Sequence, residues 1–381
     1  MEIASFAAAP ADTEIATIYV ALELSKNRWL VGVHTPLADK VSRYAVPGGN
    51  SGALLDRIDR IREEAERRLE RPVRIVCCYE AGYDGFWLHR LLCANGIENQ
   101  VMDPASLPVN RRARRAKTDR IDLAALLRTL MAWHRGEKQV CRMVRVPSPE
   151  QEDRRRHSRE RERLVKERIQ HIARIKGLLM TQGIRDFQPA RRDWPDRLER
   201  LRTGDGRALP QVLKAEVERE CRRLWQVIKM VRGVERERDA ACVADGPDQI
   251  KMLTKLVGVG EVSASILVHE VFHRNFANRR EVAGYVGLGS SPYNSGSVQR
   301  DQGISRAGNP RARRVAIELA WFWLRYQPES RLARWFHERV GTTRGRFKRI
   351  MIVALARKLI VALWRYLTTG LVPDGARVTV A

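Results

Sequence analysis

The sequence predicts an α/β domain followed by an all-α region, which comprises a long helical arm and a helical C-terminal domain. Three observations support this fold class. Strands alternate with helical segments between residues 15 and about 145, apolar residues recur at nearly heptad spacing after Pro147, and a glycine turn joins two helical segments beyond Asp248. The expected divisions are a flexible tail at 1–14, an α/β domain at 15–146, a coiled-coil arm at 147–245, a helical domain at 246–345, and a C-terminal helix and tail at 346–381.

Two β-type runs open the α/β domain. Ile15 to Leu24 and Arg28 to His34 are rich in β-branched and aromatic residues, and the short polar segment between them predicts a hairpin. Apolar residues at helical spacing predict an amphipathic helix from Asn50 to Leu69. The remaining predicted elements are a strand at Val73 to Glu80, a helix at Gly82 to Asn95 and a short strand at Val101 to Asp103.

Two long charged segments, 151–176 and 210–241, predict the helices of the arm. Each has a sparse apolar stripe, and in the second segment this stripe includes Leu224 and Ile228. We expect the two helices to form a coiled-coil-like protrusion whose stripe mediates assembly into a homo-oligomer, either a dimer or a tetramer. For most of the individual charges, a solvated helix face is the simpler interpretation.

The C-terminal region combines a glycine turn with a polar loop. The segment 253–267 predicts helix, turn and helix, and the turn at Gly258 and Gly260 exposes backbone N–H groups that can hold a DNA phosphate. A plain αα-hairpin is the alternative interpretation. A Gly- and Ser-rich loop at 287–308 follows, and apolar runs around 320–324 and 350–363 predict two further helices.

The charge balance narrows the class of partner. The 381 residues include 70 Lys and Arg against 45 Asp and Glu, a formal net charge of +25, which favours a polyanion such as nucleic acid. The longest apolar stretch, 350–367, is interrupted by Arg357, Lys358 and Arg365, so we expect no membrane span. The N-terminus lacks the pattern of a signal peptide and the six cysteines form no C-x-x-C pair, so we expect a cytoplasmic protein with reduced thiols.

Four acids are candidates for metal binding. Glu23 and Glu80 lie at the ends of predicted strands, and Asp119 and Asp122, three residues apart, share one face of a predicted helix. Carboxylates that end strands of an α/β sheet can converge with such a pair as hard oxygen ligands for two Mg²⁺ ions, which suits phosphodiester chemistry. A solvated acidic pair is the alternative.

Basic residues lie close in sequence to the four acids and to a second candidate, a serine in the polar loop. Five positive charges directly precede the acidic helix and are suited to holding a phosphate backbone; they are Arg111, Arg112, Arg114, Arg115 and Lys117. In the polar loop, Ser295 is followed by glycine, and Arg300 and Arg306 are near enough in sequence to neutralise a phosphate. No histidine accompanies this serine in the sequence, so a hydrolase triad is not supported, and on local chemistry alone Ser295 would be an ordinary loop serine.

The order of several motifs nevertheless resembles one family, the DEDD transposases of bacterial insertion sequences that use a bridge RNA to choose donor and target DNA. The resemblance covers roughly residues 15 to 340. The motifs that carry it are Ala21 to Lys26, Cys78 to Gly82, Arg115 to Asp122, the helix–glycine–helix at 256–267, Gly287-Leu288, Ser295-Gly296 and Ile304 to Asn309.

This resemblance implies a RuvC-like domain of RNase H fold, a coiled-coil insert, and a C-terminal domain whose serine becomes joined to DNA. By motif, Glu23, Glu80, Asp119 and Asp122 would hold Mg²⁺ and Ser295 would be the nucleophile. The first acid of the family is usually Asp, and Glu23 moves its carboxylate by one methylene.

The expected protein is therefore a Mg²⁺-dependent, nucleoid-associated transposase that cleaves and exchanges DNA strands through a phosphoserine intermediate, guided by a non-coding bridge RNA. Two alternatives stay open. One is a structure-specific nuclease that uses the acids with water, and the other is an inert nucleic-acid-binding relative, which Glu23 makes plausible.

Overall fold

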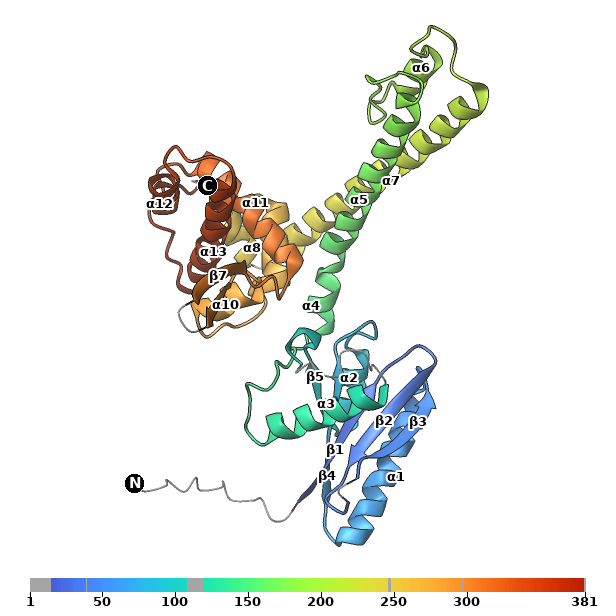
Figure 1. Ribbon diagram of the computed structural model, residues 1–381, viewed down its shortest axis with the longest axis vertical. Coiled ribbons are helices and arrows are strands. Elements are labelled where there is room, and N and C mark those ends of the chain that lie inside the picture. Colours follow the sequence, from blue (N-terminus) through green and yellow to red (C-terminus); the bar gives the residue numbers. More distant parts are fainter. Residues whose placement is uncertain (1–14, 39, 108–118, 246–247, 296–297, 380–381) are drawn as a thin grey trace. The chain divides into compact units, whose positions relative to one another are not determined.

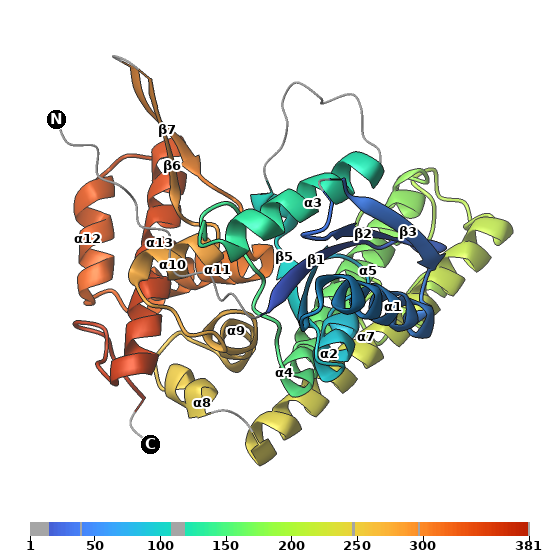
Figure 2. The ribbon, with the colours of Figure 1, turned by 90° about the horizontal axis from the view of Figure 1, so that it is seen from below.

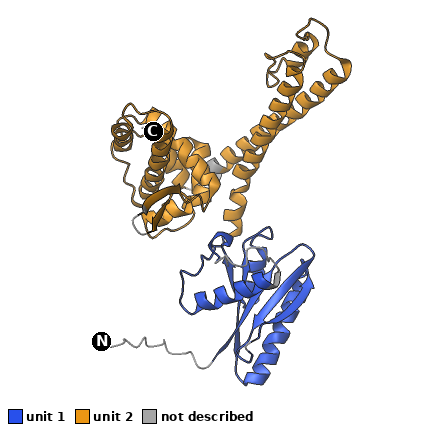
Figure 3. Ribbon diagram, in the orientation of Figure 1, with its two compact units in different colours: residues 1–147 blue, residues 148–381 orange. Residues whose placement is uncertain are grey.

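A computed structural model describes residues 15–38, 40–107, 119–245, 248–295 and 298–379; for residues 119–120, 242–245 and 298 the description covers the backbone alone. The predicted tail at 1–14 and the basic run at 111–117 lie outside the described residues. The chain divides into two compact units, residues 1–147 and 148–381 (Figure 3).

Unit 1 is built on a five-stranded mixed sheet with the strand order β3-β2-β1-β4-β5 (Figure 1). The strands are β1 (Ala16–Glu23), β2 (Arg28–His34), β3 (Ser42–Pro47), β4 (Val73–Glu80) and β5 (Glu98–Met102). β1, β2 and β3 pair antiparallel, whereas β4 runs parallel to β1 and β5 runs parallel to β4. The predicted hairpin and the strand at 73–80 are confirmed. The edge strand β3 was not predicted, because Val46 is its one buried residue and its apolar alternation is weak.

Helices cover both faces of this sheet (Figures 1 and 2). On one face, α1 (Ser51–Leu69) and α2 (Trp87–Ala94) pack with alternate residues of β1 and β4, among them Leu22 and Tyr79. On the other face, α3 (Asp119–His134) packs against residues such as Ala21. A 3-10 turn, η1 (Pro104–Ser106), follows β5.

The predicted helix at 50–69 is confirmed, and its start is explained by a cap. The Asn50 side chain accepts a hydrogen bond from the Ala53 backbone N–H at 2.9 Å, so the helix begins at Ser51. The predicted helix at 82–95 begins later, at Trp87, because a turn through Gly85, whose φ is +66°, precedes it.

Two long helices of unit 2 form the arm (Figure 1). Its helices are α4 (Pro149–Arg154), α5 (Arg156–Met180), α6 (Trp194–Glu199) and α7 (Gln211–Asp245). α5 and α7 lie side by side in opposite directions, since Arg161 contacts Glu235 at 2.6 Å and His171 contacts Glu220 at 2.7 Å. The predicted pair of long helices is thus confirmed.

The apolar stripe of the arm is buried within the chain. Leu224 and Val217 of α7 are fully buried and pack in one cluster with Ile175 and Leu179 of α5, while Ile228 packs at its margin. This differs from the expected oligomer seam, because the stripe already covers its own partner helix. The homo-oligomer stays a prediction, and it would need another surface.

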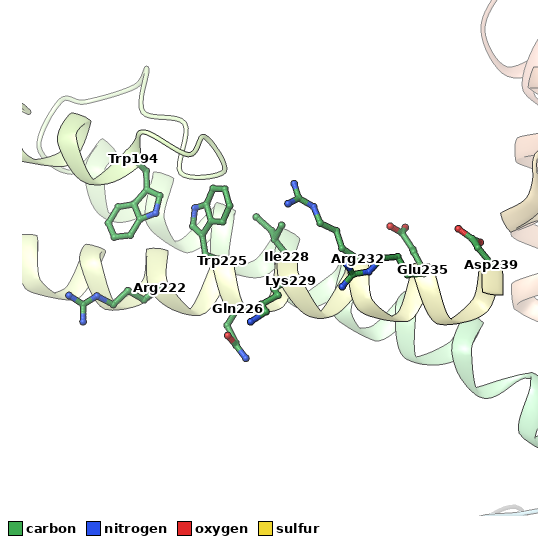
Figure 4. A pocket seen from close by; sticks show the side chains of 10 residues that line it. Trp194, Arg222, Trp225, Gln226, Ile228, Lys229, Arg232, Glu235 and Asp239 are labelled. Atoms are coloured by element: carbon green, nitrogen blue, oxygen red, sulfur yellow. The ribbon is translucent and has the colours of Figure 1, made fainter. Parts of the chain in front are cut away.

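Aromatic residues fix the tip of the arm beside α7. Trp225 donates its indole N–H to the Pro189 carbonyl oxygen at 3.1 Å, and the buried Trp194 of α6 lies across from it (Figure 4). A shallow hollow of about 870 Å³ extends from these rings along α7, where Lys229 and Arg232 lie near Glu235. The mixed charges give this hollow no strong preference for an anion.

The rest of unit 2 is a helical domain that carries one β-hairpin. Its elements are α8 (Asp248–Thr254), α9 (Glu261–Leu267), the π-helix η3 (Val268–Phe272), α10 (Arg279–Tyr285), β6 (Ser290–Ser295), β7 (Val298–Ile304), α11 (Pro310–Tyr326), α12 (Arg331–Val340) and α13 (Arg346–Thr369). α13 packs into the same core as α8 to α12, around Trp323 and Leu355. The expected apolar helices are confirmed as α11 and α13. Among the described residues, no helix has the length and apolar character that a membrane crossing requires.

Truncating the core of the arm should destabilise unit 2. Leu224→Ala removes fully buried atoms between α5 and α7, so we expect the free energy of unfolding to fall by about 3 kcal/mol. Met230→Ala on the same helix is the matched control, since Met230 is 45% exposed and its loss should cost at most about 0.5 kcal/mol. Denaturant unfolding followed by circular dichroism measures both, and equal stability of the two variants would contradict the packing described.

Candidate active site

Glu23 and Glu80 lie at the same edge of the sheet in unit 1. The parallel register places Leu22 opposite Tyr79, so the two acids are the next residues on neighbouring strands. Side chains alternate between the faces of a sheet, and Leu22 and Tyr79 pack on the face covered by α1 and α2. Glu23 and Glu80 therefore belong to the opposite face, on which α3 lies.

Contacts of α3 fix its direction across that face. At its C-terminal end, a ring nitrogen of His134 lies 3.0 Å from the hydroxyl of Tyr19, in the first half of β1. Two turns earlier in the helix, the carbonyl oxygen of Leu126 lies 3.9 Å from the thiol of Cys78, near the end of β4. α3 therefore runs antiparallel to both strands, and its first turn lies toward the edge at which they end.

The first turn of α3 brings Asp122 toward the acidic edge. Asp122 is half-buried, and Asp119 begins the helix, although its side chain lies outside the described residues. Within the described part of the chain, no three acidic, histidine or cysteine side chains come together as a metal site. The donors that Glu23, Glu80 and Asp122 offer are carboxylate oxygens, which fit Mg²⁺ chemically. A four-acid site stays a prediction.

Ser295 is presented by a β-hairpin in unit 2, not by an irregular loop. It ends β6, pairs with Val298 across the turn, and is exposed. Tyr293 lies opposite Arg300, so Ser295, Tyr293 and Arg300 share one face of the hairpin. The diagonal Ser295 and Arg300 are then roughly 7–8 Å apart between Cα atoms. The sequence suggested a loop because glycine, serine and polar residues hide the alternation of a strand.

Two glycines close the base of this hairpin. Gly287 has φ +72°, and a Cβ there would lie 2.4 Å from the Ala307 carbonyl oxygen. Gly308 has φ +108°, and a Cβ would lie 2.3 Å from the Tyr285 carbonyl oxygen. Backbone bonds cross the base at 2.8 Å from Asn309 N–H to Tyr285 oxygen and at 3.2 Å from Arg306 N–H to Gly287 oxygen. Both glycines are therefore structural requirements of the hairpin base.

A buried carboxylate connects the hairpin base to the arm. Glu270 is 1% exposed and accepts two hydrogen bonds from the Arg159 guanidinium of α5, at 2.8 and 3.1 Å. It also accepts a bond from the Asn309 side-chain amide at 2.9 Å. Burial alone would raise the pKa of Glu270, but the bonds and charge of Arg159 outweigh it and lower the pKa below its usual range. We call Arg159, Glu270 and Asn309 the Glu270 clamp.

Asn309 performs a second task in this clamp. Its side-chain oxygen accepts hydrogen bonds from the Arg311 and Ala312 backbone N–H groups at 3.0 and 3.2 Å, which caps α11. One side chain thus fixes the start of α11, the end of the hairpin base and the contact to Glu270.

A second acid ties α5 to α11 beside the clamp. Glu162 receives Arg311 at 2.6 Å and Arg314 at 2.8 Å. Partial burial would raise the pKa of Glu162, but the hydrogen bonds and charges of Arg314 and Arg311 prevail and lower it to about 2. The arm is therefore joined to the helical domain through two ionised carboxylates.

The glycine turn at 258–260 has a packing explanation. Gly258 has φ +90°, and a Cβ there would lie 2.9 Å from the side chain of Tyr326. Gly260 is exposed and precedes α9, a helix of seven residues. Binding of DNA phosphate by this turn stays a prediction. Arg306, with φ +57°, is exposed and its carbonyl oxygen accepts a bond from Arg313 at 2.9 Å, which holds the turn after β7.

With this geometry in view, comparison with known proteins identifies the family. Residues 250–334, which include the hairpin, match the model described as the Transposase IS116/IS110/IS902 family. Over 375 residues the chain is 48% identical to "Putative transposase y4rJ" of Sinorhizobium fredii (strain NBRC 101917 / NGR234), covering 95% of both chains. The chain belongs to the IS116/IS110/IS902 family of transposases.

More distant relatives agree. The chain is 26% identical over 300 residues to "Transposase for insertion sequence element IS1111A" of Coxiella burnetii, covering 74% of each protein. It is 26% identical over 249 residues to "Transposase for insertion sequence element IS1328" of Yersinia enterocolitica, covering 61% of this chain and 70% of the relative. Transposases cleave and transfer DNA strands, so this membership confirms the predicted insertion-sequence transposase at the level of family and enzyme class.

Sequence reasoning missed the Glu270 clamp of this transposase. Glu270 is a single acid inside the largely apolar run 267–272, which also contains His269, and Asn309 precedes a proline at the start of a helix. An isolated acid in an apolar run indicates a paired buried charge, which was the available signal. The partner Arg159 lies 111 residues earlier, among many solvated arginines, so the sequence does not single it out.

Acid should destabilise unit 2 through His269. Burial, followed by the positive charges of Arg154 and Arg155, lowers the pKa of His269 from 6.5 to about 4, so the folded protein holds the ring neutral. Because the unfolded chain binds the proton first, stability should be lost as the pH falls from about 6.5 to 4, by up to about 3 kcal/mol. Urea unfolding at several pH values measures this dependence. His269→Gln should flatten it in this window, and an unchanged slope would contradict the assignment.

Proposed function

We propose that this transposase cleaves and exchanges DNA strands through a covalent phosphoserine formed by Ser295, with Mg²⁺ bound by acids of unit 1. The observation that carries the proposal is the hairpin, which exposes Ser295 beside Arg300 and lies within the segment that matches the transposase family. A serine held on a braced hairpin suits a nucleophile that must meet a fixed phosphate.

The sheet of unit 1 supports an RNase H-like domain of the RuvC type. Three antiparallel strands followed by two parallel ones, in the order β3-β2-β1-β4-β5, place Glu23 and Glu80 side by side with the start of α3 toward them. Glu23, Glu80, Asp119 and Asp122 would hold Mg²⁺, which supplies Lewis-acid stabilisation of charge on the scissile phosphate.

The residues of unit 2 would perform the transfer itself. The Ser295 hydroxyl oxygen attacks the phosphorus and loses its proton to solvent; one P–O bond forms and the bond to the departing strand breaks. The departing oxygen takes up a proton and leaves as a hydroxyl. Because one phosphodiester is exchanged for another, between the DNA strand and the serine oxygen, a second DNA hydroxyl can reverse the step and rejoin a strand without consuming water. Arg300, on the same face as Ser295, would neutralise the phosphate.

The remaining partners are donor DNA, target DNA, a non-coding bridge RNA and further copies of the chain. The net charge of +25 supports polyanionic partners, while the bridge RNA rests on the motif resemblance. Ser295 and the acids belong to different units, so the proposed reaction requires residues of both. The paired helices α5 and α7 are proposed as the coiled-coil element of such an assembly.

Single substitutions should separate the two halves of the proposed site. With Mg²⁺ and labelled DNA carrying an element end, Ser295→Ala should abolish the protein–DNA adduct seen on a denaturing gel while duplex binding stays within about twofold. Asp122→Asn should abolish the adduct as well, because residues that act as one unit are strongly non-additive. Ser291→Ala, on the same strand, is the matched control and should keep the adduct.

Each other outcome of this experiment supports a different function. An adduct that survives Ser295→Ala refutes the serine assignment. Metal-dependent nicking that never yields an adduct in the unsubstituted protein supports a nuclease that uses water. Binding without cleavage indicates an inert relative, for which the glutamate at position 23 would be the first explanation.

A further inference from the structure

A long basic groove in unit 2 is not accounted for by the acids or the serine. It has a volume of about 2240 Å³ and is bounded by α13, α12, the start of α10, β7 and the segment 371–374. Ten of its lining residues are Arg or Lys and two are acids, Asp301 and Asp374. We call it the α13 groove. Its charge contrasts with the mixed hollow on the arm, so it favours an anionic occupant.

α13 supplies half of these cations, spread along its length. They are Arg346, Arg349, Arg357, Lys358 and Arg365. At a rise of about 1.5 Å per helical residue, the line from the first to the last is roughly 28 Å long. A DNA duplex carries one phosphate per about 3.4 Å on each strand, and one turn is about 34 Å long. The length fits most of one turn of duplex and far exceeds a small anion.

The cations of the groove have few partners within the protein. Among the described residues, one ion pair involves a groove cation, between Arg331 and Asp374 at 3.6 Å. Arg346, Arg349 and Arg365 are exposed. Lys358 lies with its ammonium 4.7 Å from the centre of the Trp335 ring, which orients it without neutralising it. Charges left unpaired in this way are suited to an external polyanion.

The floor of the groove is apolar and allows close approach. Val353 and Val361 are half-buried, and Ile350 is 53% exposed. These aliphatic side chains lie among the cations of α13 and let a sugar–phosphate backbone pack against the helix. An acidic protein segment would also meet an apolar floor, but the length of the cationic line and membership of a transposase family favour nucleic acid.

The hairpin connects this groove to the proposed nucleophile. Ser290 and Arg300 line the groove, and Ser295 lies five residues beyond Ser290 on the same strand. At about 3.4 Å per residue, Ser295 is roughly 17 Å from Ser290, whereas Arg300 is its diagonal neighbour at roughly 7–8 Å. A strand that leaves the groove beside Arg300 would reach Ser295 within about two nucleotides.

We propose that the α13 groove binds the phosphate backbone of the DNA duplex whose strand Ser295 attacks, over most of one helical turn. The proposal rests on the proposed function for the identity of the duplex. In the sequence, cations of α13 interrupt an apolar run. The proposal gives these cations the role of positioning the substrate. Contacts to phosphate carry no sequence information, so the groove would set register and leave choice of site to other elements.

The test is the salt dependence of DNA binding by the full chain. Fluorescence anisotropy with a labelled 30-base-pair duplex gives log K against log salt for the double variant Arg349→Gln/Arg357→Gln. Loss of two phosphate contacts should reduce the slope by about 1.8 and weaken binding about 30-fold at 0.15 M salt. Arg334→Gln/Arg200→Gln removes the same charge from exposed positions outside the groove, and should leave the slope unchanged.

Further variants and a second duplex distinguish the alternatives. Arg300→Gln, on the hairpin wall, should reduce the slope by about 0.9 and keeps the test valid if the double variant does not fold. An unchanged slope for DNA binding by the groove variants overturns the proposal. The proposal also fails if these variants bind DNA normally but show a reduced slope with a duplex RNA of equal length. If the groove variants behave as expected but no variant forms an adduct, the groove stands and the serine mechanism fails.

Discussion

A buried carboxylate, Glu270, holds together three parts of unit 2: the arm, the start of α11 and the base of the serine hairpin. An ionised group at 1% exposure is stable when its charge is paired and its oxygens are saturated, and Arg159 and Asn309 meet both conditions. The hairpin itself has little core of its own, since β6 is largely exposed. Its orientation therefore depends on the closed base and on the Glu270 clamp behind it.

The two units present charges of opposite sign at their proposed sites. In unit 1 the carboxylates gather at the edge where β1 and β4 end, which suits a cation. In unit 2 the acids Glu270 and Glu162 are paired with Arg159, Arg311 and Arg314, whereas the arginines that α13 contributes to the groove have no ion pair among the described residues. The proposed mechanism uses both, the acids of unit 1 for metal ions and the groove of unit 2 for a DNA backbone beside the proposed nucleophile.

Periodicity and caps made much of the fold predictable, and long-range pairing made the rest unpredictable. The strands ending in Glu23 and Glu80, the helix after Asn50 and the long helices of the arm follow from local patterns. The hairpin around Ser295 does not, because Gly287 and Gly308 read as loop residues until their close approach to distant carbonyls is seen. Likewise the stripe at Leu224 indicated an apolar partner correctly, but heptad spacing does not distinguish a helix of the same chain from one of another. The candidate nucleophile came from motif order, and the clamp behind it required the structure.

The claim that the Glu270 clamp fixes the serine hairpin is tested most directly by hydrogen–deuterium exchange of the full chain. In Glu270→Gln, the amides of Ser305, Arg306 and Asn309, which close the hairpin base, should exchange at least about tenfold faster, a change of about 1.4 kcal/mol in local opening. Glu338→Gln, an exposed acid of α12, should leave them unchanged. Unaltered protection of these three amides in Glu270→Gln would contradict the account.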